Sequence, residues 1–223
     1  MNLFSKLAIG LAMAASLLTV SAPAARADDA GLLNDAIGTV DDLRHSPNFD
    51  AARHAMRGAR AVLIVPALVK GGFIFGAEGG SGVLLARTRG GWSSPAFYTL
   101  GSASFGFQAG IQKAELVMII TSDRALRALQ DSKFKIGANA GLTVVTLGAG
   151  VEGATTGNLS GDIIVWSQAA GVYGGISVNG SVVAPDDKAN ARFYGTTRTE
   201  TILANGVKNP ATAGLRHKLA SSF

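Results

Sequence analysis

The sequence contains no cysteine and only three histidines, and these absences exclude several kinds of chemistry. Without cysteine the chain has no disulfide, no thiolate nucleophile and no cysteine-based metal site. The histidines, His45, His54 and His217, have no metal-ligating partner at helical spacing, so each is expected to be a surface residue. The stability of the fold must therefore come from packing.

Sequence motifs of enzymes and nucleotide-binding proteins are also missing. No P-loop is present, and Ser81 does not fit a nucleophile elbow because no glycine stands two residues after it. Residues 148–153, GAGVEG, match a dinucleotide-binding fingerprint, but the following ATTGNLSGD opposes the helix that must begin there. We therefore expect no enzymatic activity, no cofactor and no metal.

Carboxylates are few in the glycine-rich middle of the chain, and Glu78 in GAEGG is the most unusual of them. A buried carboxylate there, beside Arg87, would be either structural or functional. The structural interpretation is favoured, because no second acid or histidine stands near Glu78 in the sequence.

The net charge of +5 is mild but unevenly distributed. Residues 53–113 carry seven basic side chains against Glu78 alone, and residues 188–223 carry six against Glu200. The total charge gives no argument for nucleic-acid binding. The basic middle and the basic C-terminal region are instead the parts of the chain that would contact an anionic surface.

Residues 1–27 are predicted to be a secretory signal peptide. Lys6 gives a positive start, residues 7–20 form an apolar run, and Ala25-Arg26-Ala27 places small residues where a signal peptidase reads them. The run is too short to span a bilayer as a helix. No cysteine follows this run, so we do not expect the bacterial lipid anchor, which needs a cysteine at the new N-terminus. We expect an exported protein, periplasmic or secreted, at the periphery of a membrane.

Residues 28–223 are predicted to form one α+β domain, with helices over 30–59, a β core over 61–183 and helices over 185–223. Short apolar runs broken by glycine are typical of a strongly curved, mostly antiparallel sheet or partial barrel. A helical insertion is expected at 122–131. Strands are expected at 61–65, 72–77, 81–88, 96–108, 115–121, 135–147, 162–168 and 171–183.

Two amphipathic helices are predicted to precede the sheet. Apolar residues over 30–44 share one arc at 100° per residue. Ser46-Pro47 then offers an N-cap and a first-turn proline for a second helix that ends near Gly58.

The second helix carries an apolar arc that includes Phe49 and Met56, and Arg53, Arg57 and Arg60 lie along its edge. Two interpretations remain open. An interfacial helix would place arginine stems along the apolar zone and their heads outward, at a membrane. A helix that covers the sheet would leave its arginines in water, and this interpretation is favoured.

Residues 72–87, GFIFGAEGGSGVLLAR, contain five glycines. Such glycines serve either a phosphate-binding loop or the geometry of a sheet. Strand-like runs lie on both sides and no Lys-Ser/Thr pair follows, so sheet geometry is expected, since glycine permits bulges, curvature and close approach of backbones.

The order of several motifs resembles the SYLF domain, the lipid-binding module of a group that includes eukaryotic actin regulators. The resemblance covers residues 61–206. The motifs are LVKGGFIFGAEGGSGVLLARTRGGWSSPAF, GSASFGFQAGIQKAELVMIITS, FKIGANAGLTV, WSQAAGVYGGISVNGS, NARFYG and TILANG.

The resemblance implies binding to membrane lipids, with phosphoinositides or acidic phospholipids as the ligand class in eukaryotic members. Residues 49–60 occupy the place of the family's basic amphipathic segment, and Lys70 matches its lysine before Gly-Phe. The sequence departs from the family's pattern at two places, and each departure removes a group that could bind an anionic head group. Ala169-Ala170-Gly171 replaces the family's Ser-Lys-Gly, and residues 148–152 replace its Gly-Pro-hydrophobic-Gly-Arg turn.

The predicted function is therefore non-enzymatic binding of acidic phospholipid or phosphoinositide-like head groups at the cell envelope. The lipid-binding residues are predicted to be Phe49, Arg53, Met56, Arg57, Arg60 and Lys70. The alternative is a structural or protein-interaction domain of the envelope without a lipid ligand, whose protein partners the sequence does not name. The predicted signal peptide argues against cytoplasmic actin as the natural partner.

Overall fold

The computed structural model describes residues 29–72, 75–105, 110–131, 133–137, 141–147, 160–170 and 180–223. The predicted signal peptide and the GAGVEG sequence lie outside these residues, as does most of the predicted strand 171–183.

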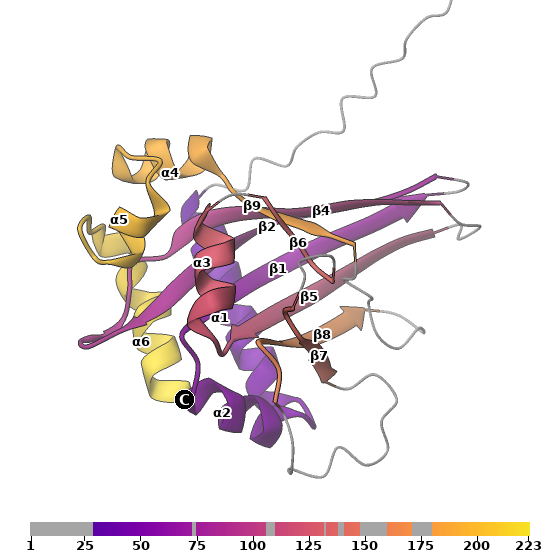
Figure 1. Ribbon diagram of the computed structural model, residues 1–223, viewed down its shortest axis with the longest axis horizontal. Coiled ribbons are helices and arrows are strands. Elements are labelled where there is room, and N and C mark those ends of the chain that lie inside the picture. Colours follow the sequence, from indigo (N-terminus) through magenta and orange to yellow (C-terminus); the bar gives the residue numbers. More distant parts are fainter. Residues whose placement is uncertain are drawn as a thin grey trace, which may run out of the picture.

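The helices precede and follow the sheet, with one insertion between its strands (Figure 1). They are α1 (Asp29–His45), α2 (Phe49–Arg57), α3 (Asp123–Asp131), α4 (Asp187–Tyr194), α5 (Thr199–Leu203), the short 3₁₀ helix η1 (Pro210–Thr212) and α6 (Ala213–Ser222). Helices at both ends of the chain and the insertion at α3 agree with the sequence prediction.

The second helix begins later than Ser46-Pro47 predicts. Helix α2 starts at Phe49, and Asn48 stands at its N-cap position without a capping side-chain hydrogen bond. The Ser46 hydroxyl instead donates to the Leu43 carbonyl oxygen at 2.8 Å. Ser46 therefore satisfies a carbonyl at the end of α1, and Pro47 lies in the turn between the two helices.

The described residues form nine strands in one strongly curled sheet, a half-barrel. Their order is β6-β9-β4-β2-β1-β5-β8-β7, with β3 paired to β2. The strands are β1 (Ala61–Gly72), β2 (Phe75–Thr88), β3 (Gly91–Trp92), β4 (Ala96–Phe105), β5 (Gly110–Ile120), β6 (Phe134–Lys135), β7 (Val144–Leu147), β8 (Ile163–Ala170) and β9 (Val182–Pro185).

The predicted α+β class and the mostly antiparallel sheet are confirmed, and β7 beside β8 is the parallel pair. Several predicted strand boundaries were wrong. Strand β1 continues to Gly72, whereas the first predicted strand ended at residue 65. Strand β2 is continuous where a break was expected at residues 78–80. Residues 135–147 are not one strand, since Gly137 and Gly141 adopt positive φ angles of 79° and 85° and end the extended backbone.

Both faces of the sheet are buried, each in its own hydrophobic core. Along β1, Leu63 and Val65 belong to one core, and Val62 and Ile64 belong to the other, because successive side chains of a strand point to opposite faces. Helices α3 and α5 contribute to the first core, and α1, α2 and α6 contribute to the second. This burial on two sides explains the continuous apolar run AVLIV at the start of β1.

Strands β1 and β2 approach each other closely at two glycines. A Cβ atom on Gly82 would lie 2.6 Å from the Ile64 carbonyl oxygen, and one on Gly80 would lie 2.6 Å from the Ala67 carbonyl oxygen. The pairing of the two strands is irregular between Ile64 and Val69. These glycines serve sheet geometry, as the sequence predicts.

Candidate functional site

Helix α2 buries its apolar arc in the core of the sheet. Ala52 and Met56 have 0% exposure, and Ala55 is also buried. The arc is therefore a core face, as in the interpretation of α2 as a helix that covers the sheet. Contact between Met56 and a lipid would require α2 to leave the sheet.

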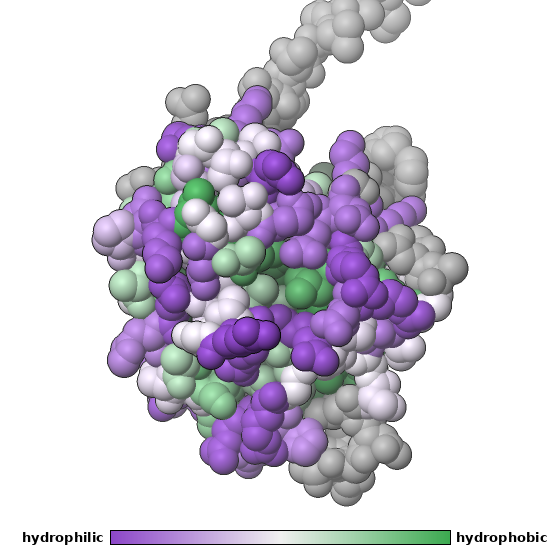
Figure 2. Space-filling model, turned by 60° about the vertical axis from the view of Figure 1, so that its left-hand side comes forward, coloured by the Kyte–Doolittle hydropathy of each residue, from purple (hydrophilic) through white to green (hydrophobic). Residues whose placement is uncertain are grey.

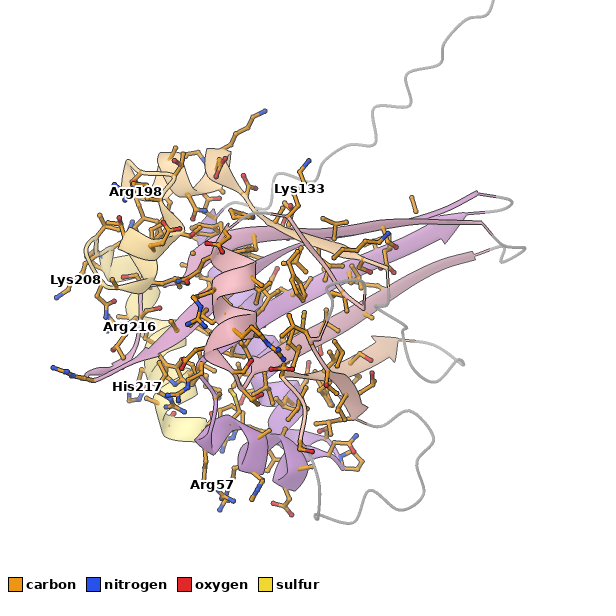
Figure 3. All side chains as sticks on the ribbon, in the orientation of Figure 1. Arg57, Lys133, Arg198, Lys208, Arg216 and His217 are labelled. Carbon is orange, nitrogen blue, oxygen red and sulfur yellow. The ribbon has the colours of Figure 1, made fainter. Side chains whose placement is uncertain are left out.

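The outward face of α2 carries more basic than acidic side chains, with Asp50 as its exposed acid. Arg53, His54 and Arg57 are exposed, and an Arg57 terminal nitrogen lies 2.7 Å from His54 Nδ1. Neither Arg53 nor Arg57 forms a salt bridge with any carboxylate of the described chain. Figure 3 shows Arg57 projecting from the α2 end of the molecule.

The other predicted lipid-binding residues have different surroundings. Arg60 forms an exposed ion pair with Asp123 at the start of α3, with 3.2 Å between Nε and Oδ1. Phe49 is half-buried, and its ring centroid lies 5.9 Å from that of Phe223 after α6. Lys70 is the cross-strand partner of Glu78 in β2, and its side chain lies outside the described part of the structure.

Arg87 and Arg216 each contact Trp92, at its ring and at its backbone carbonyl respectively, and sequence reasoning missed both contacts. Arg87 donates to the Met56 carbonyl oxygen at 2.9 Å, near the end of α2, and its guanidinium carbon lies 4.1 Å from the centre of the Trp92 ring. Arg216 on α6 donates from Nε to the Trp92 carbonyl oxygen at 2.8 Å. The fold alone brings Arg216 to Trp92, because α6 is far from β3 in the sequence.

Several residues of the glycine-rich and aromatic motifs are structural. Asn190 is fully buried and pairs with the backbone of Phe97 at 2.8 and 3.0 Å, which fastens α4 to β4. Asn205 accepts from the Ser94 N–H at 2.7 Å, and Ser93 accepts from the Ala86 N–H at 2.9 Å. The motifs NARFYG, TILANG and WSSP thus contain side chains that fix the backbone.

Glu78 is buried, and Ser181 before β9 donates a hydrogen bond to its Oε1. Arg87 does not pair with Glu78, since its described contacts are with Met56 and Trp92. No group of three or more potential metal ligands occurs among the described residues. Glu78 therefore joins strands within the curled sheet, as the structural interpretation predicts.

Glu115 on β5 connects the sheet to α1. Its Oε1 accepts from the Thr39 hydroxyl at 3.0 Å, and Thr39 is fully buried. Burial raises the pKa of Glu115, and the charge of Asp42 raises it further, while the Thr39 hydrogen bond and Lys113 oppose the shift. The folded protein therefore holds this proton more tightly than the unfolded chain does.

By linkage, this stabilising contribution is complete below the unfolded glutamate pKa of about 4.3 and is lost as the pH rises through the higher folded value. Glu115→Gln should therefore raise the melting temperature at about pH 7 and change it little at about pH 4. Thermal unfolding followed by circular dichroism would measure this. Equal changes in the melting temperature at both pH values would show that folding does not raise the pKa of Glu115.

Comparison with known proteins gives the family. The model of the Ysc84 family, described as "Las17-binding protein actin regulator", matches residues 101–222, from β4 to the end of α6. The chain belongs to the Ysc84 family. This match confirms the resemblance to the SYLF domain. The helices and strands described above are thus those of a Ysc84-family domain.

Relatives of the Ysc84 family occur in vertebrates and yeast. The chain is 30% identical over 189 residues to SH3 domain-containing YSC84-like protein 1 of Xenopus laevis, a match that covers 83% of this chain and 56% of that protein. It is 30% identical over 165 residues to Protein YSC84 of Saccharomyces cerevisiae, covering 72% and 35%. It is 28% identical over 162 residues to the yeast LAS seventeen-binding protein 3, covering 71% and 35%. The chain thus spans little more than half of the vertebrate relative and about a third of the yeast ones.

Proposed function

We propose that this Ysc84-family protein is a non-enzymatic module that binds acidic phospholipids at a membrane surface. The observation that carries the proposal is the outward face of α2, where Arg53 and Arg57 are exposed and have no carboxylate partner in the described chain. An anionic surface complements such a face, and each cation near it contributes about 1 kcal/mol.

The proposed contact is peripheral and electrostatic. The apolar side of α2 is buried in the core. In this position α2 therefore presents its charged side chains to the membrane, and not its apolar arc. Among the described helices, none is long and apolar enough to cross a bilayer. The binding should therefore depend strongly on ionic strength, because salt screens exposed charges.

Co-sedimentation with vesicles tests the function. Vesicles of phosphatidylcholine alone should leave the protein in the supernatant, and vesicles with about a third of phosphatidylglycerol should carry it into the pellet at low salt, since the attraction is to negative charge. Binding to both vesicle types alike, or to neither, would contradict the proposal.

The proposed site of action is the cell envelope. Protein isolated from the envelope of the native cell should begin at Asp28, since the peptidase would cleave after Ala25-Arg26-Ala27. N-terminal sequencing by Edman degradation would show this directly. A sequence that still reads MNLFSK would exclude export by cleavage at this site.

A second candidate is a protein-interaction domain without a lipid ligand. The family description and the name of the yeast relative both refer to binding of Las17 or LAS seventeen, which is a protein partner of those proteins. A Ysc84-family chain that fails to bind either kind of vesicle would favour this alternative.

A further inference from the structure

Asn205 and Gly206 form an Asn-Gly pair directly after α5. In an unfolded chain this dipeptide is reactive, because glycine has no Cβ atom to hinder attack by its own nitrogen. The glycine nitrogen loses its proton and bonds to the side-chain amide carbon of the asparagine, and the amide group leaves as ammonia. Water then opens the resulting succinimide ring and leaves either aspartate or isoaspartate. Whether the pair reacts in the folded protein depends on how the two groups are held.

The backbone of this pair forms a left-handed cap on α5. Asn205 has a φ angle of 60°, the one positive φ of a non-glycine residue in the described part of the chain. The Asn205 N–H donates to the Ile202 carbonyl oxygen at 3.0 Å, and the Gly206 N–H donates to the Thr201 carbonyl oxygen at 2.9 Å. Such a pair of bonds around a left-handed residue closes many helices, and asparagine is among the residues that adopt this conformation most readily. The nitrogen that would attack is therefore held in a hydrogen bond of the cap.

The side chain of Asn205 is held as well. Its Oδ1 accepts from the Ser94 N–H at 2.7 Å, and the Ser94 hydroxyl donates to the Val207 carbonyl oxygen at 2.9 Å. Ser94, which precedes β4, thus binds the chain on both sides of Gly206. Ring closure brings the side-chain amide carbon of Asn205 onto the Gly206 nitrogen, whereas the folded chain directs that amide to the backbone of Ser94. Both reacting groups are therefore engaged in other bonds.

The cap is anchored in the core on one side and reaches the surface on the other. Ile202 and Leu203 of α5 are buried in the first core, and Gly206 is exposed. The face that carries the C-terminal helices is largely hydrophilic (Figure 2). A Cβ atom on Gly206 would lie 2.9 Å from Thr201 Cγ2, so the close packing of the cap favours glycine at this position. Water can therefore reach the Asn-Gly pair, and the cap is what prevents its reaction.

We propose that Asn205 is a deamidation site that is unreactive in the folded protein and reacts when the cap on α5 opens. The aspartate product still offers an oxygen to the Ser94 N–H and tolerates a positive φ, so it rebuilds the cap. The isoaspartate product does not, because its main chain has one additional carbon atom, which displaces the Gly206 N–H from the Thr201 carbonyl oxygen. Isoaspartate at this position therefore marks a chain that has unfolded and prevents its return to the native structure. This modification is independent of any ligand of the protein.

Peptide mapping by mass spectrometry tests the protection. The protein is incubated at mildly alkaline pH, either folded in buffer or unfolded in guanidinium chloride, and isoaspartate is labelled with an isoaspartyl methyltransferase. Residues 179–180 are a second Asn-Gly pair and serve as the internal reference in the unfolded chain. Residues 205–206 should react at the reference rate when unfolded and at least about tenfold more slowly when folded, since the cap must open first. Equal rates in the folded and unfolded protein would overturn the proposal.

The variant Ser94→Ala tests the cap itself. It removes the hydroxyl bond to Val207 and keeps the backbone N–H for Asn205, so the cap should open more often. Deamidation of the folded variant should be several-fold faster, with the unfolded rate unchanged. The matched control is Ser93→Ala, because Ser93 is also buried but its hydroxyl bonds lie outside residues 199–207. Equal acceleration in both variants, measured where circular dichroism shows both folded, would mean that protection is global and would overturn the role of the cap.

Refolding tests the consequence of the modification. Chains deamidated in guanidinium chloride are diluted into buffer, and the folded fraction is separated by size-exclusion chromatography. This fraction should contain aspartate at position 205 and be depleted of isoaspartate there. The variant Asn205→Asp, which carries the first product from the start, should refold with a melting temperature close to that of the wild type. Isoaspartate at undiminished abundance in the folded fraction would overturn the marking of unfolded chains, as would an Asn205→Asp variant that fails to refold.

Discussion

Replacing Gly82 with valine is expected to lower the free energy of unfolding by about 3 kcal/mol, and Gly80→Val should have a similar effect. The new Cβ atom would lie 2.6 Å from a backbone carbonyl oxygen in each case. A backbone atom in a central strand cannot move away as a flexible side chain can, so β1 and β2 would have to separate. In a domain of this size the melting temperature should fall by roughly 10 °C.

The chain offers a matched control at Gly79, which is exposed. A Cβ atom there would lie 3.9 Å from its nearest neighbour, the Leu100 carbonyl oxygen. Gly79→Val should therefore change the melting temperature little. If Gly80→Val and Gly82→Val fold with wild-type stability but lose vesicle binding, the glycine-rich sequence would be a ligand cradle, contrary to the sheet-geometry assignment.

Replacing Arg53 and Arg57 with glutamine is expected to weaken binding to phosphatidylglycerol vesicles about 30-fold at low salt. Each cation contributes about 1 kcal/mol near an anionic surface, and two together change the binding constant by this factor. At about 1 M salt the Debye length is only ~3 Å, so the variant and the wild type should differ little. Co-sedimentation at both salt concentrations would measure the two effects.

Arg60 and Phe49 provide the controls for this prediction. Arg60 is already paired with Asp123, so Arg60→Gln should weaken binding less than either Arg53→Gln or Arg57→Gln. Phe49 packs on Phe223, so Phe49→Ser should lower the melting temperature. A double glutamine variant that still binds vesicles at low salt would move the contact away from α2, and the basic C-terminal region after Lys188 would be the next candidate.

The sequence predicted the helices well because their signals are local. The apolar arc of α1 and the insertion at α3 follow from spacing at 3.6 residues per turn. The predicted start of α2 was wrong because the Ser46 hydroxyl can serve either of two helix ends. It could cap the N-terminus of α2, but it donates instead to the Leu43 carbonyl oxygen at the end of α1. A capping pattern in a sequence does not say which of two adjacent helix ends it serves.

The candidate site was predictable only in part, for a different reason. Arg53 and Arg57 stand out in the sequence as an edge of basic residues, and they are exposed as that pattern requires. Met56 belongs to the same amphipathic pattern, yet the pattern does not say whether its apolar side faces a membrane or a sheet. Arg216 gives no signal at all, because its contact with Trp92 joins residues more than a hundred positions apart.

By itself the sequence determined the α+β class, the family motifs and the role of glycine in the sheet, because hydrophobic periodicity and glycine chemistry are local properties. Only the tertiary structure decided which cations remain free. Arg60 is paired across the fold with Asp123, Arg87 binds the end of α2, and Arg216 reaches Trp92 from α6. The partner of a long side chain depends on how distant segments pack, and no spacing along the chain contains that information.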